Sequence, residues 1–352
     1  MDRKYAKLFA GAATVALAAT SLGAATAVAQ DDGYNIGFSN SGGVGNGWRE
    51  EQLCSVRAQA AASGEVAGLT DIHRDTDQTG QLEDIRNLIA AEVDAIVLNP
   101  SSPDGLNSAL KEATDAGIVV VAVDAEVTEP SAYVLSNNQE EYARMGAEWL
   151  FEKIGGEGNV FYMRGIAGHP ADDARDKGWL AALEAYPGIN VAVETHTGWD
   201  PAVGKQQIAD TLLSGEQIDG VWTSGLGKSV VDAYTESGTP LVPVVGADNS
   251  GFVNYLAGDV EGLEGAAITN PGTVGGAGVA LALQILNGEA PESNTVYVDP
   301  VLWANDTEEG QALIQASLKP DLNLDPLWPI LTQIEGWTTY TDEELVACEG
   351  PA

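Results

Sequence analysis

Hydrophobic and polar residues alternate along the chain in blocks, and each block has the period of a strand or of a helix. An apolar run at residues 34–39 predicts a strand, and residues 48–63 predict a helix because Leu53, Val56 and Ala60 recur on one helical face. Further strands are predicted at residues 68–75, 94–100 and 118–125, with helices between them at 79–92 and 103–117. The first part of the chain therefore favours βα units in an open, mostly parallel sheet.

The same rhythm is repeated in the second part of the chain. Helices are predicted at residues 140–155, 172–188, 202–215, 227–238 and 273–287, and strands at 158–165, 189–198, 218–225, 241–249 and 265–271. Two successive α/β units of similar build imply an α/β fold with two Rossmann-like lobes, each holding a parallel sheet. The apolar run within residues 94–100 supports this fold, because a strand that helices cover on both faces needs no alternating polar positions.

The N-terminal residues have the composition of an export signal. Three cations precede an alanine-rich apolar stretch over residues 8–28, and residues 27–29 fit the A-x-A pattern of a cleavage site. An uncleaved membrane anchor is the alternative, since the apolar stretch is nearly long enough to span a bilayer. The A-x-A end favours a signal peptide at residues 1–29, cleaved near Ala29, and an exported mature protein.

The mature chain is strongly acidic. The full sequence has 52 acidic and 16 basic residues, and removal of one acid and three cations with the signal peptide leaves 51 and 13, a net charge of −38. A charge of this sign repels nucleic acid and anionic lipid, so neither is expected as a partner. The acidic residues are scattered, which indicates a solvated surface suited to a saline habitat.

Cysteine and histidine usage favours a disulfide over a metal centre. The two cysteines, Cys54 and Cys348, lie near opposite ends of the mature chain, and an even pair in an exported protein indicates a disulfide. This bond would tie the C-terminal tail to the first helix. The histidines His73, His169 and His196 show no ligand spacing, so no metal and no cofactor are expected.

A glycine-rich loop precedes the first helix. Residues 42–47 contain four glycines and are followed by Trp48 and Arg49. A Walker A loop needs Lys and Ser or Thr at these two positions, and a dinucleotide fingerprint needs Gly in place of Trp48, so both phosphate motifs fail. The loop is then either a flexible connection or a turn that presents the flat apolar face of Trp48 to a ligand.

The carboxyl ends of the predicted strands carry polar and aromatic residues, and ligands bind at these ends in open α/β sheets. The residues at these ends are Ser39, Asn99, Asp124, the loop 165–175, Trp199, Thr223, Ser224, Asp248, Asn249, Thr269 and Asn270. This set lacks a nucleophile paired with a base, and therefore favours binding over catalysis.

Four segments resemble one family. The stretches DAIVLNPSSPDGL, VVVAVDA, GNVFYMRGIAGHPADDARDKGW and PVVGADNSG, in this order and spacing, resemble the type I periplasmic binding proteins, and among them the ribose-type sugar-binding proteins of ABC importers. The resemblance extends from Tyr34 to about Asp299. It implies two lobes joined by a multi-strand hinge. Residues 31–135 plus 270–298 would form the N-terminal lobe, and residues 136–269 plus 299–352 the C-terminal lobe and tail.

The resemblance also implies a ligand site and no catalytic residue. Its ligand-binding positions fall on Asn46, Trp48, Asn99, Asp124, Arg175, Trp199, Asp248 and Asn270. The chain departs from the ribose binders at Ala125, where they have arginine, and at Arg49, where a second aromatic is usual. Ser224 replaces an asparagine, and the tail beyond residue 302 is longer than theirs.

These residue types suit an uncharged polyol. The two tryptophans could cover the C–H faces of a sugar ring, and the aspartates and asparagines could pair with its hydroxyls. Each residue also has an alternative structural role. Trp48 could pack on its helix, Asp124 and Asp248 could cap turns, Arg175 could lie on a solvated face, and Asn270 could begin a helix.

The expected function is therefore that of a monomeric, periplasmic solute-binding protein. It would capture a monosaccharide or similar polyol by hinge closure and deliver it to an ABC permease. A receptor for autoinducer-2 or another small polyol, coupled to a sensor kinase or chemoreceptor, is the alternative. A transcription repressor would need a basic helix-turn-helix at the N-terminus. A hydrolase could use Asp124 and Asp248 as a carboxylate pair, and would be recognised by product formation.

Overall fold

The computed structural model describes residues 33–43, 45–330 and 332–351. The predicted signal peptide at residues 1–29 and its cleavage site near Ala29 lie outside the described residues. Within the described part, no helix combines the length and the hydrophobicity that crossing a membrane requires.

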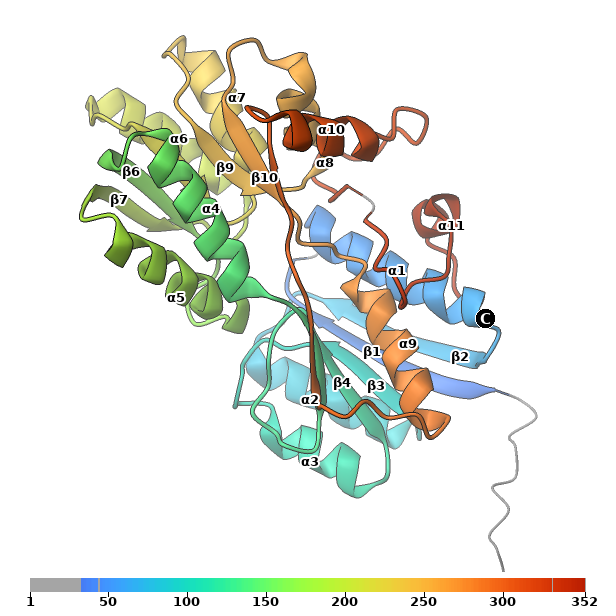
Figure 1. Ribbon diagram of the computed structural model, residues 1–352. Helices are drawn as coiled ribbons and strands as arrows, with labels where there is room; N and C mark the ends of the chain where they lie inside the picture. The colour runs from blue at the N-terminus through green and yellow to red at the C-terminus, as the bar shows by residue number, and fades with distance from the viewer. Residues whose placement is uncertain (1–32, 44, 331, 352) are drawn as a thin grey trace, which may run out of the picture. The chain divides into compact units, whose positions relative to one another are not determined.

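The first lobe is built on a parallel sheet (Figure 1). Its strands are β1 (Tyr34–Ser41), β2 (Val66–Arg74), β3 (Ala95–Asn99), β4 (Val119–Val123), β5 (Tyr133–Asn137) and β11 (Thr295–Val298), in the spatial order β11-β5-β4-β3-β1-β2. Its helices are α1 (Gly47–Ser63), α2 (Gln78–Ala90), α3 (Asn107–Asp115) and α9 (Val274–Leu286). β5 and β11 were not expected from the pattern of the sequence.

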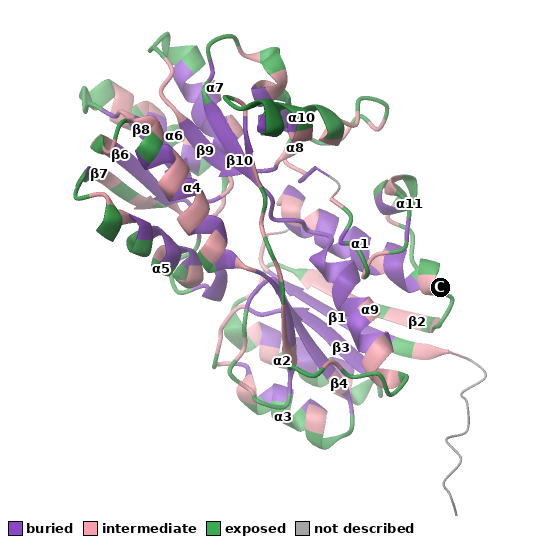
Figure 2. Cartoon of the chain, in the orientation of Figure 1, coloured by how far each residue is buried: buried purple, intermediate pink, exposed green. Residues whose placement is uncertain are grey.

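Both faces of this sheet are covered by helices, as the apolar run in β3 requires. Val97 and Val121 pack with Leu53 of α1 in one hydrophobic cluster that also includes α9. Ile96, the neighbour of Val97, points to the other face and packs with Leu110 of α3. The central strand β3 is accordingly buried along its whole length (Figure 2).

The second lobe has a second sheet with helices on both faces. Its strands are β6 (Glu157–Arg164), β7 (Gly188–His196), β8 (Gly220–Thr223), β9 (Val244–Ala247), β10 (Gly265–Ile268) and β12 (Leu302–Ala304), in the order β12-β10-β9-β8-β6-β7. Its helices are α4 (Gln139–Lys153), α5 (Pro170–Ala185), α6 (Pro201–Ser214), α7 (Gly227–Ser237), α8 (Ser250–Asn254), the π-helical turn η1 (Tyr255–Asp259) and α10 (Glu308–Ser317). All neighbouring strands are parallel except β12, which is antiparallel to β10. The expected α/β fold with two lobes is thus confirmed.

The chain passes between the two sheets at several points of the described part. It leaves the first sheet after β5 to form α4, returns from β10 to α9, and passes again from β11 to β12. The first two of these crossings leave the carboxyl ends of β5 and β10, where a ligand site is expected.

The tail contacts both lobes, although the sequence assigned residues 299–352 to the second lobe. β12 and α10 pack on the second sheet, where Trp303 and Ile314 enter its hydrophobic cluster. The last helix, α11 (Asp342–Ala347), packs instead beside α1 of the first lobe (Figure 1). The predicted disulfide between Cys54 and Cys348 is confirmed. It explains why α11 lies beside α1, because it bonds the end of the tail to that helix.

Candidate functional site

A cavity of about 680 Å³, part of it open to solvent, lies at the carboxyl ends of the strands and is lined by residues of both lobes. Of the residues expected from the sequence, the cavity is lined by Asn46, Trp48, Asp124, Arg175, Trp199 and Asn270. The structure thus brings together side chains that are up to 224 positions apart, from Asn46 to Asn270.

The glycine-rich loop turns tightly and places Asn46 at the start of α1. Gly43 and Gly45 have positive φ values of 74° and 82°, which a residue with a Cβ rarely adopts. The Asn46 side chain caps α1 by accepting from the Arg49 N–H at 3.2 Å, and it donates to the Trp199 carbonyl of the other lobe at 3.3 Å. The N-terminus of α1 is therefore capped by the protein itself, which disfavours a phosphate at this position.

The two tryptophans are fixed by hydrogen bonds from their indole nitrogens. Trp48 Nε1 donates to the Asn270 carbonyl at 2.6 Å, and Trp199 Nε1 donates to Ser224 Oγ at 3.0 Å. Trp199 has a φ of 55°, in the left-handed region that non-glycine residues seldom occupy. Both rings are partly exposed at the cavity, so an apolar face on each lobe is available to a ligand.

Asp124 lies in the cavity wall in a strained backbone conformation, with φ at 69°. The Ser136 hydroxyl holds this conformation by donating to the Asp124 carbonyl at 2.7 Å. The Asp124 carboxylate accepts from Gln139 Nε2 at 2.8 Å and, over a longer 3.4 Å, from the amides of Asn99 and Asn137. Burial raises the pKa of Asp124, and the charges of nearby Arg175 and Arg49 oppose that rise.

Arg175 and Gln139 connect the polar groups of the two lobes. Arg175 Nε donates to Gln139 Oε1 at 2.7 Å, and its Nη1 donates to Ser224 Oγ at 2.7 Å. The guanidinium also lies 4.2 Å from the ring centroid of Tyr142, a cation–π contact. Sequence reasoning missed Gln139, because its role follows only from its place as the first residue after the crossing from β5.

Arg49 is a second buried guanidinium at the cavity. Its Nη1 donates to Asn40 Oδ1 at 2.8 Å, and its Nη2 lies 3.2 Å from His169 Nε2. Burial, together with Arg49 and Arg175, holds the pKa of His169 well below its ordinary value, so the ring is neutral. The arginine side chains at the cavity therefore come from α1 and α5. None comes from position 125, where the ribose binders have arginine and this chain has alanine.

Two of the expected residues, Asn99 and Asp248, lie behind the cavity wall. Both are fully buried, and the lining of the cavity includes neither. Asn99 donates to Asp124 and to Gln52 Oε1, the latter at 3.1 Å. Asp248 Oδ1 accepts from the Asn270 N–H at 3.1 Å, and burial raises the pKa of Asp248 to about 7. These two side chains therefore hydrogen-bond to Asp124 and Asn270, which line the cavity, and do not line it themselves.

The cavity also has apolar lining that the sequence did not suggest. Leu226 and Ala247 of the second lobe and Leu327 of the tail contribute to it. In the part of the chain that the structure describes, no group of three or more histidine, cysteine, aspartate or glutamate side chains has a metal-binding arrangement. The cavity thus offers apolar surface together with fixed donors and acceptors.

The sequence and the fold were compared with those of known proteins. Residues 36–290 match a family model described as a periplasmic binding protein domain. A xylitol-binding protein of Mycolicibacterium smegmatis is 30% identical over 241 residues, which are 66% of this chain and 67% of that protein. The galactofuranose-binding protein YtfQ of Escherichia coli is 25% identical over 238 residues, 65% of this chain and 71% of the relative.

Two solved structures agree with these sequence matches. The ABC transporter solute binding protein of Thermobispora bispora superposes with a TM-score of 0.73 at 26% identity, and the match covers 82% of this chain and 89% of that structure. An arabinose-binding component from Shewanella, bound to L-arabinofuranose, has a TM-score of 0.72 at 23% identity over 80% of this chain and 95% of that one, which supports the fold.

Proposed function

Because this chain belongs to the family of periplasmic binding proteins, and is a solute-binding protein of an ABC importer rather than an enzyme, we propose that its cargo is a monosaccharide or a similar polyol. The observation that carries the proposal is the cavity itself. Its lining combines two partly exposed indole rings with Asp124 and Arg175, an acceptor and a donor that Gln139 links by hydrogen bonds from outside the lining. A polyol has the matching surfaces, with apolar C–H faces and hydroxyl edges.

The charges in the cavity favour an uncharged ligand. Arg175 is held by Gln139 and Ser224, and Arg49 by Asn40 and His169, so both guanidiniums already have neutral partners. Asp124 is the carboxylate that these two cations face across the cavity wall. A hydroxyl that donates to Asp124 would add a charge-assisted hydrogen bond, roughly 1.5–3 kcal/mol.

Export and oligomeric state belong to the same proposal. The signal-like residues 1–29 and the mature charge of −38 support a monomer that works outside the cytoplasm and does not bind nucleic acid. The two lobes would close on the ligand at the crossings near β5 and β10, and the closed form would deliver it to the permease.

Calorimetric titration of the mature protein tests the proposed cargo. Protein that begins at Gln30 is titrated with pentoses, hexoses, pentitols, inositols and autoinducer-2, and each mixture is analysed afterwards for chemical change of the ligand. We expect one-to-one binding of a sugar or polyol that is recovered unchanged. Binding of autoinducer-2 alone would favour a receptor role. No binding by folded, ligand-free protein would refute the proposed ligand class and leave the family assignment in place.

A further inference from the structure

The tail forms a tight turn at the edge of the cavity. Trp328 N–H donates to the Asp325 carbonyl at 2.9 Å, and Leu327 N–H donates to Asp325 Oδ1 at 2.8 Å. Pro326 fixes the backbone at the second position, as is usual in such turns. Leu327 therefore stands at the tip of the turn; the residue is half-buried and lines the cavity.

The second lobe binds this turn through its backbone. At the start of α8, Ser250 N–H donates to the Trp328 carbonyl at 2.7 Å, and Gly251 N–H donates to the Pro326 carbonyl at 3.0 Å. The Asn249 side chain donates to the Leu327 carbonyl at 2.9 Å. Bonds at three successive positions of the turn leave little freedom for Leu327 to move away from the cavity.

Glycines on both lobes make room for the turn. A Cβ added to Gly47 at the start of α1 would lie 2.5 Å from the carbonyl carbon of Leu327. A Cβ added to Gly251 would lie 2.8 Å from Pro326 Cβ. Neither distance is compatible with non-bonded carbon atoms, since such contacts are optimal near 3.5–4.0 Å. The turn is thus in direct backbone contact with the helix that carries Trp48.

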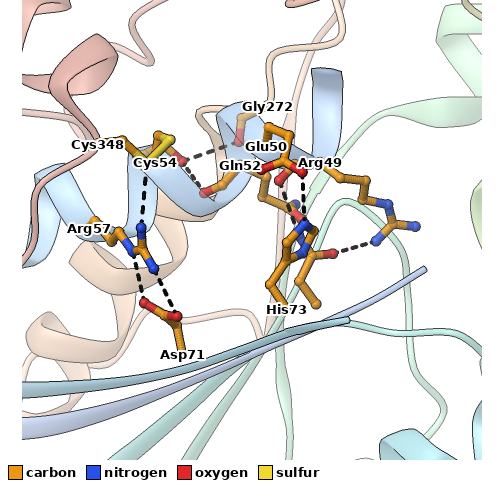
Figure 3. The surroundings of a disulfide bond; sticks show 11 residues. Arg49, Glu50, Gln52, Cys54, Arg57, Asp71, His73, Gly272 and Cys348 are labelled. Carbon is orange, nitrogen blue, oxygen red and sulfur yellow. Dashed lines mark hydrogen bonds and ion pairs between the residues drawn. A yellow bond between two sulfur atoms is a disulfide. The ribbon is translucent and has the colours of Figure 1, made fainter. Parts of the chain in front are cut away.

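Beyond the turn, the tail is anchored to the first lobe. Ile334 and Trp337 pack in the same hydrophobic cluster as α1, and Thr339 N–H donates to Gln59 Oε1 at 2.9 Å. The anchor ends in the bond between Cys54 and Cys348, beside the Arg57–Asp71 ion pair (Figure 3). This bond spans 294 positions of the sequence and fixes the end of the tail on α1.

We propose that Leu327 is a ligand-contacting residue that limits the size of the ligand, and that the anchored tail holds it in the cavity wall. The inference rests on the proposed function, because it concerns the same cavity. A leucine side chain offers only apolar contact, so it meets a C–H face of the ligand and excludes bulk on that side. The tail is then part of the binding site as well as a covering of α1.

Leu327→Ala tests the inference, with Leu324→Ala as the matched control. Leu324 lies in the same tail but packs against the cluster around Cys54, away from the cavity. We expect Leu327→Ala to weaken the binding of the preferred ligand at least tenfold and to improve the binding of a bulkier derivative relative to it. Leu324→Ala should leave both affinities within twofold, and urea unfolding of both variants should show that they are folded.

Gly47→Ala provides a second perturbation, because its new methyl group should displace the turn without changing any tail residue. It should reproduce the change in selectivity of Leu327→Ala. Unaltered affinity and selectivity in Leu327→Ala would overturn the inference. If the wild-type protein binds nothing in the panel, the proposed ligand class fails separately, and a crystal structure of the mature protein then decides the placement of the tail. A crystal structure with Leu327 packed against Gly47 at the cavity would support the inference about the tail. A tail that lies elsewhere would overturn that inference.

Discussion

Replacement of Asp124 by asparagine should separate ligand binding from stability. The Asp124 backbone has a φ of 69°, which Asn tolerates better than most residues, so the substitution should preserve the backbone conformation. The Ser136 hydroxyl bonds the backbone carbonyl at this position, and the substitution leaves that contact unchanged. The change therefore removes one charge at nearly constant shape.

The size of the effect on binding follows from the contacts of the carboxylate. Oδ1 accepts from Gln139 at 2.8 Å, whereas Oδ2 has only the long 3.4 Å contact to Asn99 and remains available to a ligand hydroxyl. A hydrogen bond to a charged group contributes roughly 1.5–3 kcal/mol, so Asp124→Asn should raise the Kd roughly 10- to 150-fold. Calorimetric titration with the preferred ligand measures this change.

Although Asp124→Asn should weaken ligand binding, it should leave the stability of the fold unchanged or increase it. Burial raises the pKa of Asp124, which means that the folded protein disfavours the charged form relative to water. The neutral amide removes this cost, so the free energy of unfolding at pH 8 should be unchanged or higher in urea titrations. Asp115→Asn is the control, because Asp115 is exposed and pairs with Lys111 far from the cavity. A Kd within twofold of the wild type, or a clear loss of stability, would refute the reasoning.

Three further predictions concern other parts of the same structure. Trp48→Ala should weaken binding by a few kcal/mol, and Trp48→Phe by less, although Phe leaves the Asn270 carbonyl without its indole partner; titration of both variants measures the difference. The pKa of Asp248 is raised from 3.8 to about 7, so the folded state retains a proton that the unfolded state has lost. The free energy of unfolding should therefore fall as pH rises from about 4 to about 7, by at most about 4 kcal/mol at 1.36 kcal/mol per unit, and level off above pH 7. Asp248→Asn should remove this part of the pH dependence in urea unfolding, and equal slopes in both proteins would count against it. Gly178→Ala should cost about 1–3 kcal/mol in chemical unfolding, because its Cβ would lie 1.9 Å from the Glu140 carbonyl oxygen where α5 packs on α4; a stable variant would show that these helices can separate.

Much of the fold could be predicted because its signals are local. Val97 and Ile96 are adjacent apolar residues that pack on opposite faces of the sheet, and such runs indicate a strand covered on both sides. Asn46, Asp77 and Asp200 each cap a helix that the pattern predicted. Short elements were missed: β12 has three residues, and β5 has five, of which only the first three are apolar.

The site could be predicted in part. Parallel strands place their carboxyl ends at one edge, so strand-end residues such as Asp124 could be assigned to a common cavity from the sequence. Whether a side chain lines the cavity or stands behind it depends on packing between distant segments. Asn99 and Asp248 also follow strands, yet both are buried behind the wall. Gln139 is central to the polar network because the crossing from β5 directs it there.

The sequence by itself determined the alternation of most strands and helices, the α/β class and the chemical character of the site, because these depend on the hydrophobic period and on the residues that follow each strand. The tertiary structure decided which of these side chains share a cavity, and it alone placed Leu327 beside Gly47, from which it is separated by 280 positions. No local pattern encodes such a contact. It results from the packing of the tail across both lobes and from the bond of Cys348 to α1, which act only once the chain has folded.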